Sequence, residues 1–194
     1  MKNAGFFKGY KQRLVDLINN IDDIILEDII QAMERTIELK SKIYIIGNGG
    51  SSATASHMTN DFGVGLRRRQ IRNFDVWSLA DNSPVITAAA NDMGYDQIFK
   101  AQLEGLLKVD DVIIAISCSG NSPNIIYAVE YAKQVGSIVI GLTGFKGGKL
   151  KALSDINFHV NSKDEEYGLV EDLHMILDHI IYTYFIEVIG PTHD

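Results

Sequence analysis

The sequence has few of the residues that mark disulfide-rich proteins, linkers or membrane spans. Among 194 residues there is one cysteine, Cys118, so no disulfide can form within the chain. The three prolines, Pro84, Pro123 and Pro191, lie far apart and form no linker-like cluster. The longest apolar runs, such as Val112–Ile116, are too short to cross a bilayer. We therefore expect a chain without a disulfide framework, a membrane span or a flexible linker.

Positive charge is also scarce, with 18 Lys and Arg against 25 Asp and Glu, which gives a formal net charge of −7. Such a chain lacks the general basic field through which proteins bind duplex nucleic acid. The N-terminal segment has neither a long apolar core nor a small-residue cleavage site, so we expect no signal peptide. Together with the single cysteine, these features predict a cytoplasmic protein that binds neither nucleic acid nor membrane.

The overall composition is that of an ordinary globular protein, with 46% hydrophobic and 22% charged residues. In the first forty residues apolar side chains recur at spacings of three and four, as at Leu14, Leu17, Ile18 and Ile21, which predicts helices. We expect a helical extension over residues 1–40, packed either on a partner subunit or on its own domain. Residues 41–194 are expected to form one compact domain.

Beyond residue 40 short apolar runs alternate with helical patterns. The predicted strands are Lys42–Ile46, Phe74–Leu79, Asp111–Ile116, Ser137–Leu142 and Ile156–Val160. The predicted helices are one that begins at Ser51, Ser83–Asn91, Pro123–Val135 and Glu165–Ile189. This alternation predicts βαβ units, and hence an α/β fold with a parallel sheet covered on both faces. In such folds ligands bind beyond the carboxyl ends of the strands.

The first predicted strand ends in a glycine- and serine-rich loop, Gly47–Ser52, that opens a helix. Its glycines let backbone N–H groups approach an anion, and the helix N-terminus adds partial positive charge. The loop contains neither the Gly-Lys-Ser/Thr of a Walker motif nor the GxGxxG of dinucleotide-binding folds. We therefore expect an anion site and no nucleotide cofactor.

A second loop, Ser117–Ser122, follows another predicted strand and precedes a helix whose first residue is Pro123. Its serine hydroxyls and backbone N–H groups can satisfy the terminal oxygens of a phosphate monoester without a Lys or Arg. The alternative is that these residues only cap a helix. Two such loops, each at the end of a predicted parallel strand, favour the phosphate site.

Both loops resemble those of a known superfamily. Ile45-Ile-Gly-Asn-Gly-Gly-Ser51 and Ile116-Ser-Cys-Ser-Gly-Asn-Ser-Pro-Asn124 are similar to the phosphosugar-binding loops of SIS (sugar isomerase) domains. Ala90–Asp96 and the segment from Glu171 through His179 resemble phosphoheptose isomerases in particular. The resemblance implies a flavodoxin-like, doubly wound parallel sheet and a homotetramer with active sites at subunit interfaces. It also implies isomerisation of sedoheptulose 7-phosphate to D-glycero-D-manno-heptose 7-phosphate through an enediol.

The resemblance also implies a set of substrate-binding residues. These are Asn48, Gly49, Gly50, Ser51, Ser52, Asn91, Asp92, Ser117, Cys118, Ser119 and Ser122. The phosphate contacts fall on Ser51, Ser117, Ser119 and Ser122. Cys118 stands where the family usually has Thr, and its backbone N–H remains available. Nothing nearby in the sequence supplies Cys118 with a partner base, so we expect no catalytic thiolate.

The metal and acid–base positions of the family fall on His57, Asp61, Glu171 and His179. The resemblance implies one Zn²⁺ held by these four residues, with Asp61, His179 and Glu171 as the catalytic groups and Asp61 favoured as the base. Asp61 is usually Glu in the family, and Glu171 is usually Gln. Glu171 and His179 are eight residues apart, about 12 Å along a helix, so their side chains must lean toward each other to share an ion. His174 lies between them as a reserve ligand, although a core role would also explain it.

Other departures concern the surroundings of the sugar. An acidic residue that the family tends to have is Gly168 here, and the usual Arg after the first helix is displaced by about two positions, to Arg67. These differences leave open an isomerase for another phosphosugar. They also leave open a non-enzymatic tetrameric SIS adaptor, of the kind that binds a replication initiator, or a phosphosugar sensor.

Overall fold

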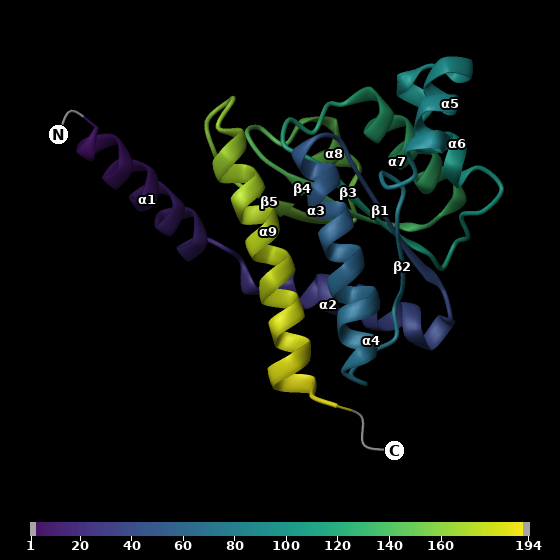
Figure 1. Cartoon of the computed structure of the whole chain (residues 1–194), viewed down its shortest axis with the longest axis horizontal. Coiled ribbons are helices and arrows are strands. Elements are labelled where there is room, and N and C mark those ends of the chain that lie inside the picture. The colour runs from purple at the N-terminus through teal and green to yellow at the C-terminus, as the bar shows by residue number, and fades with distance from the viewer. Residues whose placement is uncertain (1–2, 192–194) are drawn as a thin grey trace.

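The computed structural model describes residues 3–191. Five parallel strands form one sheet (Figure 1). They are β1 Lys42–Gly47, β2 Asp75–Ser78, β3 Val112–Ser117, β4 Ile138–Thr143 and β5 Ile156–His159. The three inner strands, β1, β3 and β4, are mostly β-branched and apolar, as strands buried on both faces require. The expected α/β fold with a parallel sheet is confirmed.

The strand order is β2-β1-β3-β4-β5, the doubly wound order of flavodoxin-like folds. The chain leaves β1 toward β2 on one side and later returns to place β3 on the other side of β1. The carboxyl ends of β1 and β3 therefore flank the switch point, where such folds bind ligands. Gly47 and Ile116 pair at these ends, so the loops that follow the two strands emerge side by side.

Helices cover both faces of the sheet. The longer ones are α1 Ala4–Asn19, α2 Asp23–Leu39, α3 Gly50–Met58, α5 Ser83–Met93, α7 Pro123–Val135 and α9 Tyr167–Tyr184. The shorter ones are α4 Leu66–Arg68, α6 Lys100–Leu103, α8 Gly148–Leu153, the 3₁₀ turn η2 Tyr95–Gln97, and the π-helical segments η1 Thr59–Gly65 and η3 Phe185–Ile189. Helices α2, α3 and α9 bury apolar residues against one face of the sheet, and α6, α7 and α8 do so against the other.

The alternation of side chains along each strand divides the core into these two layers. Ile43 and Ile45 face α2, α3 and α9, whereas Tyr44 and Ile46 face the opposite layer. Asp22 caps the N-terminus of helix α2, its carboxylate accepting a hydrogen bond from the backbone N–H of Ile24, and α2 contributes Met33 to the first layer. The layer under α2, α3 and α9 carries the candidate site described below.

The predicted elements agree with the structure apart from their ends and the shortest helices. All five predicted strands are present, with ends that differ by at most one residue, and the helical start divides into α1 and α2. Helix α9 begins at Tyr167 rather than Glu165 and ends at Tyr184, and the π-helical turn η3 follows it. Helices α6 and α8 were not expected, because each is too short to show a period in the sequence.

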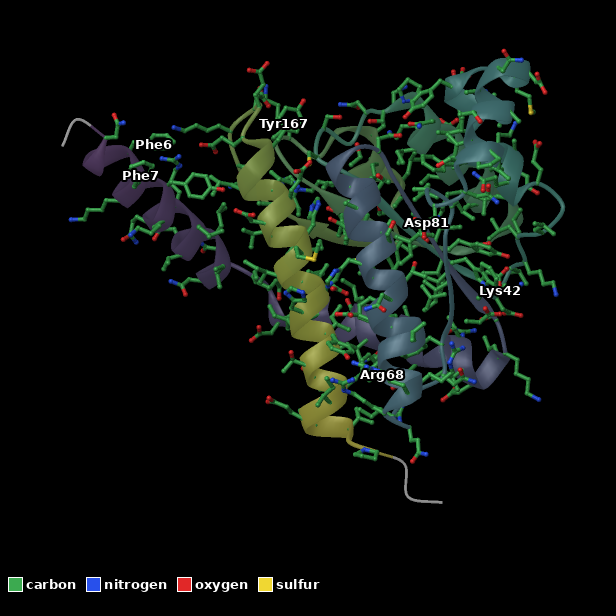
Figure 2. All side chains as sticks on the ribbon, viewed as in Figure 1. Phe6, Phe7, Lys42, Arg68, Asp81 and Tyr167 are labelled. Carbon is green, nitrogen blue, oxygen red and sulfur yellow. The ribbon has the colours of Figure 1, made fainter. Side chains whose placement is uncertain are left out.

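Helix α1 projects away from the body of the protein (Figure 1). It contacts α9 through Tyr10, whose hydroxyl donates to Asp172 at 2.7 Å, and through the Arg13–Glu166 ion pair at 3.4 Å. Phe6 and Phe7 near its start are largely exposed (Figure 2). Within residues 3–191, every helix is too short or too polar to span a bilayer.

Gly120 fixes the shape of the loop after β3. Replacing it with alanine should lower the free energy of unfolding by more than its positive φ alone explains. Gly120 has φ +64°, and a Cβ there would collide with the backbone of Gly147 and Gly148. Gly105 has φ +75° and open space around the same position. Both Gly→Ala changes pay about 1–2 kcal/mol for left-handed backbone, and only Gly120→Ala adds an overpacking cost of about 1–3 kcal/mol.

Urea unfolding of the two variants measures this difference. We expect the loss of unfolding free energy for Gly120→Ala to exceed that for Gly105→Ala. Equal losses in the two variants would show that the contact between the loops after β3 and β4 relaxes without cost.

Candidate active site

Two asparagines join the loops at the switch point. The side-chain amide of Asn48 donates to Asn124 at 2.9 Å, and the amide of Asn124 donates back to Asn48 at 2.8 Å. The hydroxyl of Tyr95 also donates to Asn48, at 3.0 Å. Asn124 is buried at the start of α7, and its side chain also accepts from the backbone of Ile125. This network holds the ends of β1 and β3 in one arrangement. Sequence reasoning did not single out Asn124 or Tyr95 as site residues.

The loop after β3 gathers its hydroxyls around a tight turn. Ser117 Oγ accepts from the backbone N–H of Gly120 at 3.1 Å and lies 3.4 Å from Ser122 Oγ. Ser119 Oγ accepts from the backbone N–H of Asn121 at 3.3 Å. Ser122 precedes Pro123 at the start of α7, and its hydroxyl caps no N–H of that helix. The positive end of a 13-residue helix and adjacent hydroxyls together make a surface that can hold an anion.

The loop after β1 meets both the second loop and α9. Ser51 is buried and hydrogen bonds to Cys118, which places the two loops in contact. The carboxylate of Glu171 lies over Gly50, in the space that a side chain at Gly50 would occupy. Ser52 donates its hydroxyl to the Gly49 carbonyl at 2.7 Å. The structure thus brings several predicted substrate residues together with Glu171 at the start of α3.

Two other predicted substrate residues lie on α5. Asn91 donates to Asp92 at 2.8 Å, and both side chains are exposed. Their assignment to the substrate stays a prediction.

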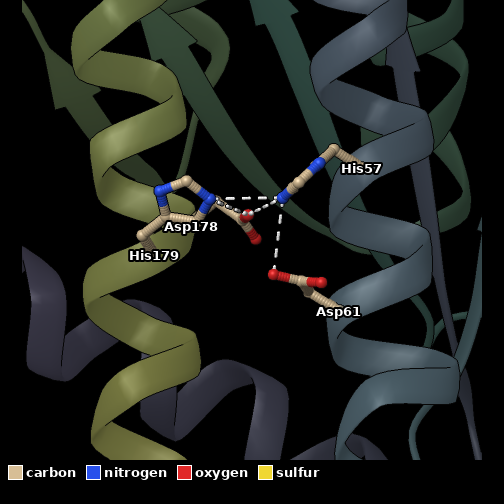
Figure 3. Close-up of side chains that lie close together, drawn as sticks. All are labelled: His57, Asp61, Asp178 and His179. Atoms are coloured by element: carbon tan, nitrogen blue, oxygen red, sulfur yellow. Dashed lines mark hydrogen bonds and ion pairs between the residues drawn. The ribbon is translucent and has the colours of Figure 1, made fainter.

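A second group of polar side chains lies where α3 and η1 pack against α9 (Figure 3). It consists of His57, Asp61, Asp178 and His179, and one ligand atom from each lies within 4.8 Å of the others. The two imidazoles meet with their Nε2 atoms 3.2 Å apart. His57 Nε2 is 3.5 Å from Asp61 Oδ2 and 3.6 Å from Asp178 Oδ2. We call these four residues the His/Asp cluster.

Helices α3 and α9 run side by side and in the same direction, which sets the order of their contacts. Glu171 lies level with Gly50, and Asp178 lies level with His57, so a step of seven residues on one helix matches seven on the other. Gly65 allows the close approach, because a Cβ there would lie 2.9 Å from the hydroxyl of Tyr182. Asp61 lies in the π-helical turn η1, a type of irregularity that often marks functional sites.

The chain matches the model of the SIS domain over residues 6–144. It is 34% identical over 175 residues to a phosphoheptose isomerase of Helicobacter pylori, covering 90% of this chain and 89% of that protein. It is 39% identical over 155 residues to a phosphoheptose isomerase of Fusobacterium nucleatum, covering 80% and 78% of the two chains. The chain belongs to the SIS-domain phosphoheptose isomerases. The family expected from the two loops is thereby confirmed.

Solved structures agree with this assignment. A phosphoheptose isomerase from Neisseria gonorrhoeae superimposes with a TM-score of 0.83 at 27% identity, covering 96% of this chain and 98% of that one. One from Francisella tularensis superimposes with a TM-score of 0.82 at 28% identity, covering 95% and 96%. The fold is thus that of phosphoheptose isomerases along nearly the whole chain.

The His/Asp cluster of this phosphoheptose isomerase family member has a buried floor and an open mouth. The side chain of Asp178 is 0% exposed and that of Asp61 is 12% exposed, whereas those of His57 and His179 are 42% and 54% exposed. Both carboxylate oxygens of Asp178 are buried without a hydrogen-bond partner among the residues described. Burial, reinforced by the nearby Asp61 carboxylate, raises the pKa of Asp178 to about 7. The donor set of two imidazoles and two carboxylates fits a divalent ion such as Zn²⁺.

Three of the four residues expected to hold a metal, His57, Asp61 and His179, lie in this cluster. The fourth, Glu171, lies instead beside Gly50. Asp178 was not expected at the site. A carboxylate on the apolar side of α9, next to Leu177, was the signal that could have revealed it. The ligand set as a whole stays a prediction.

His174 and Cys118 are buried away from water. His174 is fully buried, with Nε2 3.4 Å from the Thr143 carbonyl and the ring against Phe158, and burial lowers its pKa to about 4. It lies outside the cluster. Burial, together with the charge of Glu171, raises the pKa of Cys118 to about 11, which outweighs the opposing hydrogen bond from Ser51. The thiol therefore stays protonated near neutral pH, which agrees with the expectation of no catalytic thiolate.

Replacing Asp178 by Asn should stabilise the metal-free protein. A carboxyl whose folded pKa is raised to about 7 from 3.8 keeps its proton in the folded state, while the unfolded chain ionises. Stability is therefore lost as pH rises toward the folded pKa, at about 1.4 kcal/mol per pKa unit. In the presence of a chelator, we expect Asp178→Asn to gain a few kcal/mol of unfolding free energy over the parent at pH 8, and less at pH 5.

Urea titrations of both proteins at the two pH values provide the measurement. The informative quantity is the difference between variant and parent at each pH, because the pH dependence that the two proteins share cancels in it. A gain that does not change with pH would contradict the burial of an ionisable carboxyl at this position.

Proposed function

We propose that this protein interconverts sedoheptulose 7-phosphate and D-glycero-D-manno-heptose 7-phosphate through an enediol. The observation that carries the proposal is the combination of serine-rich loops at the switch point with an imidazole–carboxylate cluster, in a chain of this family. The serine-rich loops supply donors for a phosphate, and the cluster supplies groups that exchange protons. We place the reaction in the cytoplasm.

The distance between these two parts favours a long substrate. His57 is seven residues beyond Gly50, which is about 10 Å along α3. An extended seven-carbon sugar phosphate can reach from the loops to the cluster, whereas a triose phosphate cannot. Phosphate binding at the loops would therefore bring the first two carbons of the heptose to the imidazoles.

The isomerisation moves one proton between C1 and C2 and another between the two oxygens. In our proposal Asp61 takes the proton from C1 of the ketose, and His179 donates a proton to the C2 oxygen, which gives the enediol. Reversal of these roles at the other carbon yields the aldose. His179 is suited to both directions, because an imidazole ring can both donate and accept a proton.

We further propose that the cluster holds one divalent ion, with Zn²⁺ as the favoured metal. The fit rests on the donor set and on the unpartnered Asp178 oxygens. When bound, such an ion polarises a carbonyl and stabilises developing negative charge on oxygen. His57, Asp61 and His179 are the ligands on which the family resemblance and the geometry agree.

Conversion of sedoheptulose 7-phosphate by purified protein, followed by NMR, tests the proposal. We expect turnover that falls after chelation and returns with zinc. Asp61→Asn and His179→Ala should each lose on the order of 100-fold or more in kcat, within the usual range for a proton-transfer group. Asp164→Asn, a matched change on an exposed loop, should leave turnover unchanged.

Either variant with parental turnover would remove that residue from catalysis. No conversion by the parent, with phosphosugar binding retained, would favour another sugar phosphate or a tetrameric adaptor. Conversion unaffected by chelation would retain the isomerase and reject the metal.

We also propose a homotetramer in which α1 contributes to the interface and the active sites lie between subunits. The projecting α1 helix exposes Phe6 and Phe7, at 65% and 59%, and surfaces of this kind are usually covered by a partner. The open mouth at His57 and His179 leaves room for a neighbouring subunit over the substrate.

Light scattering after size-exclusion chromatography tests the assembly. We expect a mass four times the 21.5 kDa of the chain. A double Phe6→Ser, Phe7→Ser variant should shift toward smaller species, whereas Leu106→Ser, at a comparably exposed position after α6, should not. A monomeric parent protein would contradict the proposal.

A further inference from the structure

Within the part of the chain that the structure describes, the carboxylate of Asp178 is buried without the hydrogen-bond partner that a buried polar group normally has. Its side chain is 0% exposed, and neither oxygen has a hydrogen-bond partner among the described residues. Buried polar groups are nearly always paired, because an unpaired one forfeits its hydration without compensation. A residue this buried therefore indicates a ligand that the chain itself does not supply.

The oxygens of Asp178 point toward the space between the two imidazoles (Figure 3). Oδ2 is 3.6 Å from His57 Nε2 and 4.0 Å from His179 Nε2. The Asp61 carboxylate faces the same nitrogen, with its Oδ2 3.5 Å from His57 Nε2. Four donor atoms thus converge on one small volume. With neutral imidazoles, the two carboxylates balance the charge of one divalent cation.

Glu171 is not part of this convergence. Its carboxylate lies over Gly50, and its charge acts on Cys118, so it belongs to the end of the site formed by the loops. Gly50 is seven residues from His57, about 10 Å along α3, and Glu171 is seven residues from Asp178 on the parallel α9. To bind the same ion as the His/Asp cluster, the side chain of Glu171 would have to leave this position and extend toward the C-terminal end of α9.

We propose that Asp178, rather than Glu171, is the fourth protein ligand of the divalent ion, together with His57, Asp61 and His179. The inference rests on the metal site of the proposed function and specifies its ligands. Asp61 supplies one carboxylate oxygen beside His57, and Asp178 supplies a further oxygen to the ion from the floor of the site. The exposed sides of the imidazoles leave the mouth open for a substrate oxygen.

Metal affinity of two isosteric variants tests the assignment. Asp178→Asn and Glu171→Gln each remove one carboxylate charge while keeping the side-chain shape. Protein freed of metal by chelation is titrated with Zn²⁺ by calorimetry, and bound zinc is measured by mass spectrometry after dialysis. We expect Asp178→Asn to weaken zinc binding by at least about tenfold, the lower end of losses seen when groups around a metal site change. Glu171→Gln should stay within about threefold of the parent.

Cobalt supplies an optical readout of the same site. Co²⁺ bound to the parent gives visible absorption bands whose position and intensity depend on the ligands. Asp178→Asn should shift or weaken these bands, and Glu171→Gln should leave them in place. Circular dichroism and the melting temperature of the metal-free variants establish that each is folded. For Asp178→Asn we expect a folded protein, since the change removes a buried charge. Should it fail to fold, Asp178→Glu, which keeps the carboxylate, must still bind zinc and change the cobalt bands.

Several outcomes would overturn the assignment. Parental affinity of Asp178→Asn would do so, whether or not Glu171→Gln loses zinc, as would an absence of zinc binding by the parent. Binding is measured without substrate and turnover separately. Zinc binding that depends on Asp178, in a protein that does not convert sedoheptulose 7-phosphate, would contradict the proposed reaction and retain the ligand assignment.

Discussion

The packing of α9 against α3 and η1 is the interaction on which the candidate site depends. His57 and Asp61 come from one side of this contact, and Asp178 and His179 come from the other. Two glycines bring the elements close enough for these side chains to meet. Glu171 lies over Gly50, and the Tyr182 hydroxyl lies against Gly65. A larger residue at either glycine would separate the helices and take the imidazoles apart.

The same contact places a carboxylate where the fold by itself disfavours one. Asp178 lies beside an apolar layer that includes Leu177 and Ile181, and its oxygens have no partner among the described residues. A buried charge of this kind reduces the stability of the empty fold. Any cation that binds between the imidazoles offsets this cost, so metal binding and folding become coupled. Local conflicts with stability are expected where a protein keeps residues for function.

Much of the fold could be predicted because its signals are local. Runs of β-branched residues such as Val112–Ile116 indicate a strand whatever surrounds them, and the glycine- and serine-rich loops follow directly from where such strands end. The exact ends of α9 and the presence of α6 could not be predicted from the sequence. Helix ends and single-turn helices show no repeating pattern of apolar residues. At the site, the positions of His57, Asp61 and His179 were identified from the resemblance, whereas Asp178 and the pairing of Asn48 with Asn124 were not.

The sequence by itself determined the parallel α/β architecture, the two glycine- and serine-rich loops and the family, because each depends on residues close together in the chain. Only the tertiary structure decided which carboxylate of α9 meets His57. Asp178 and His179 are adjacent and therefore point about 100° apart around the helix, and Glu171 lies two turns away. Whether Asp178 or Glu171 reaches His57 depends on the rotation and axial register of α9 against α3. Contacts between residues more than a hundred positions apart, at Gly50 and Gly65, set that register.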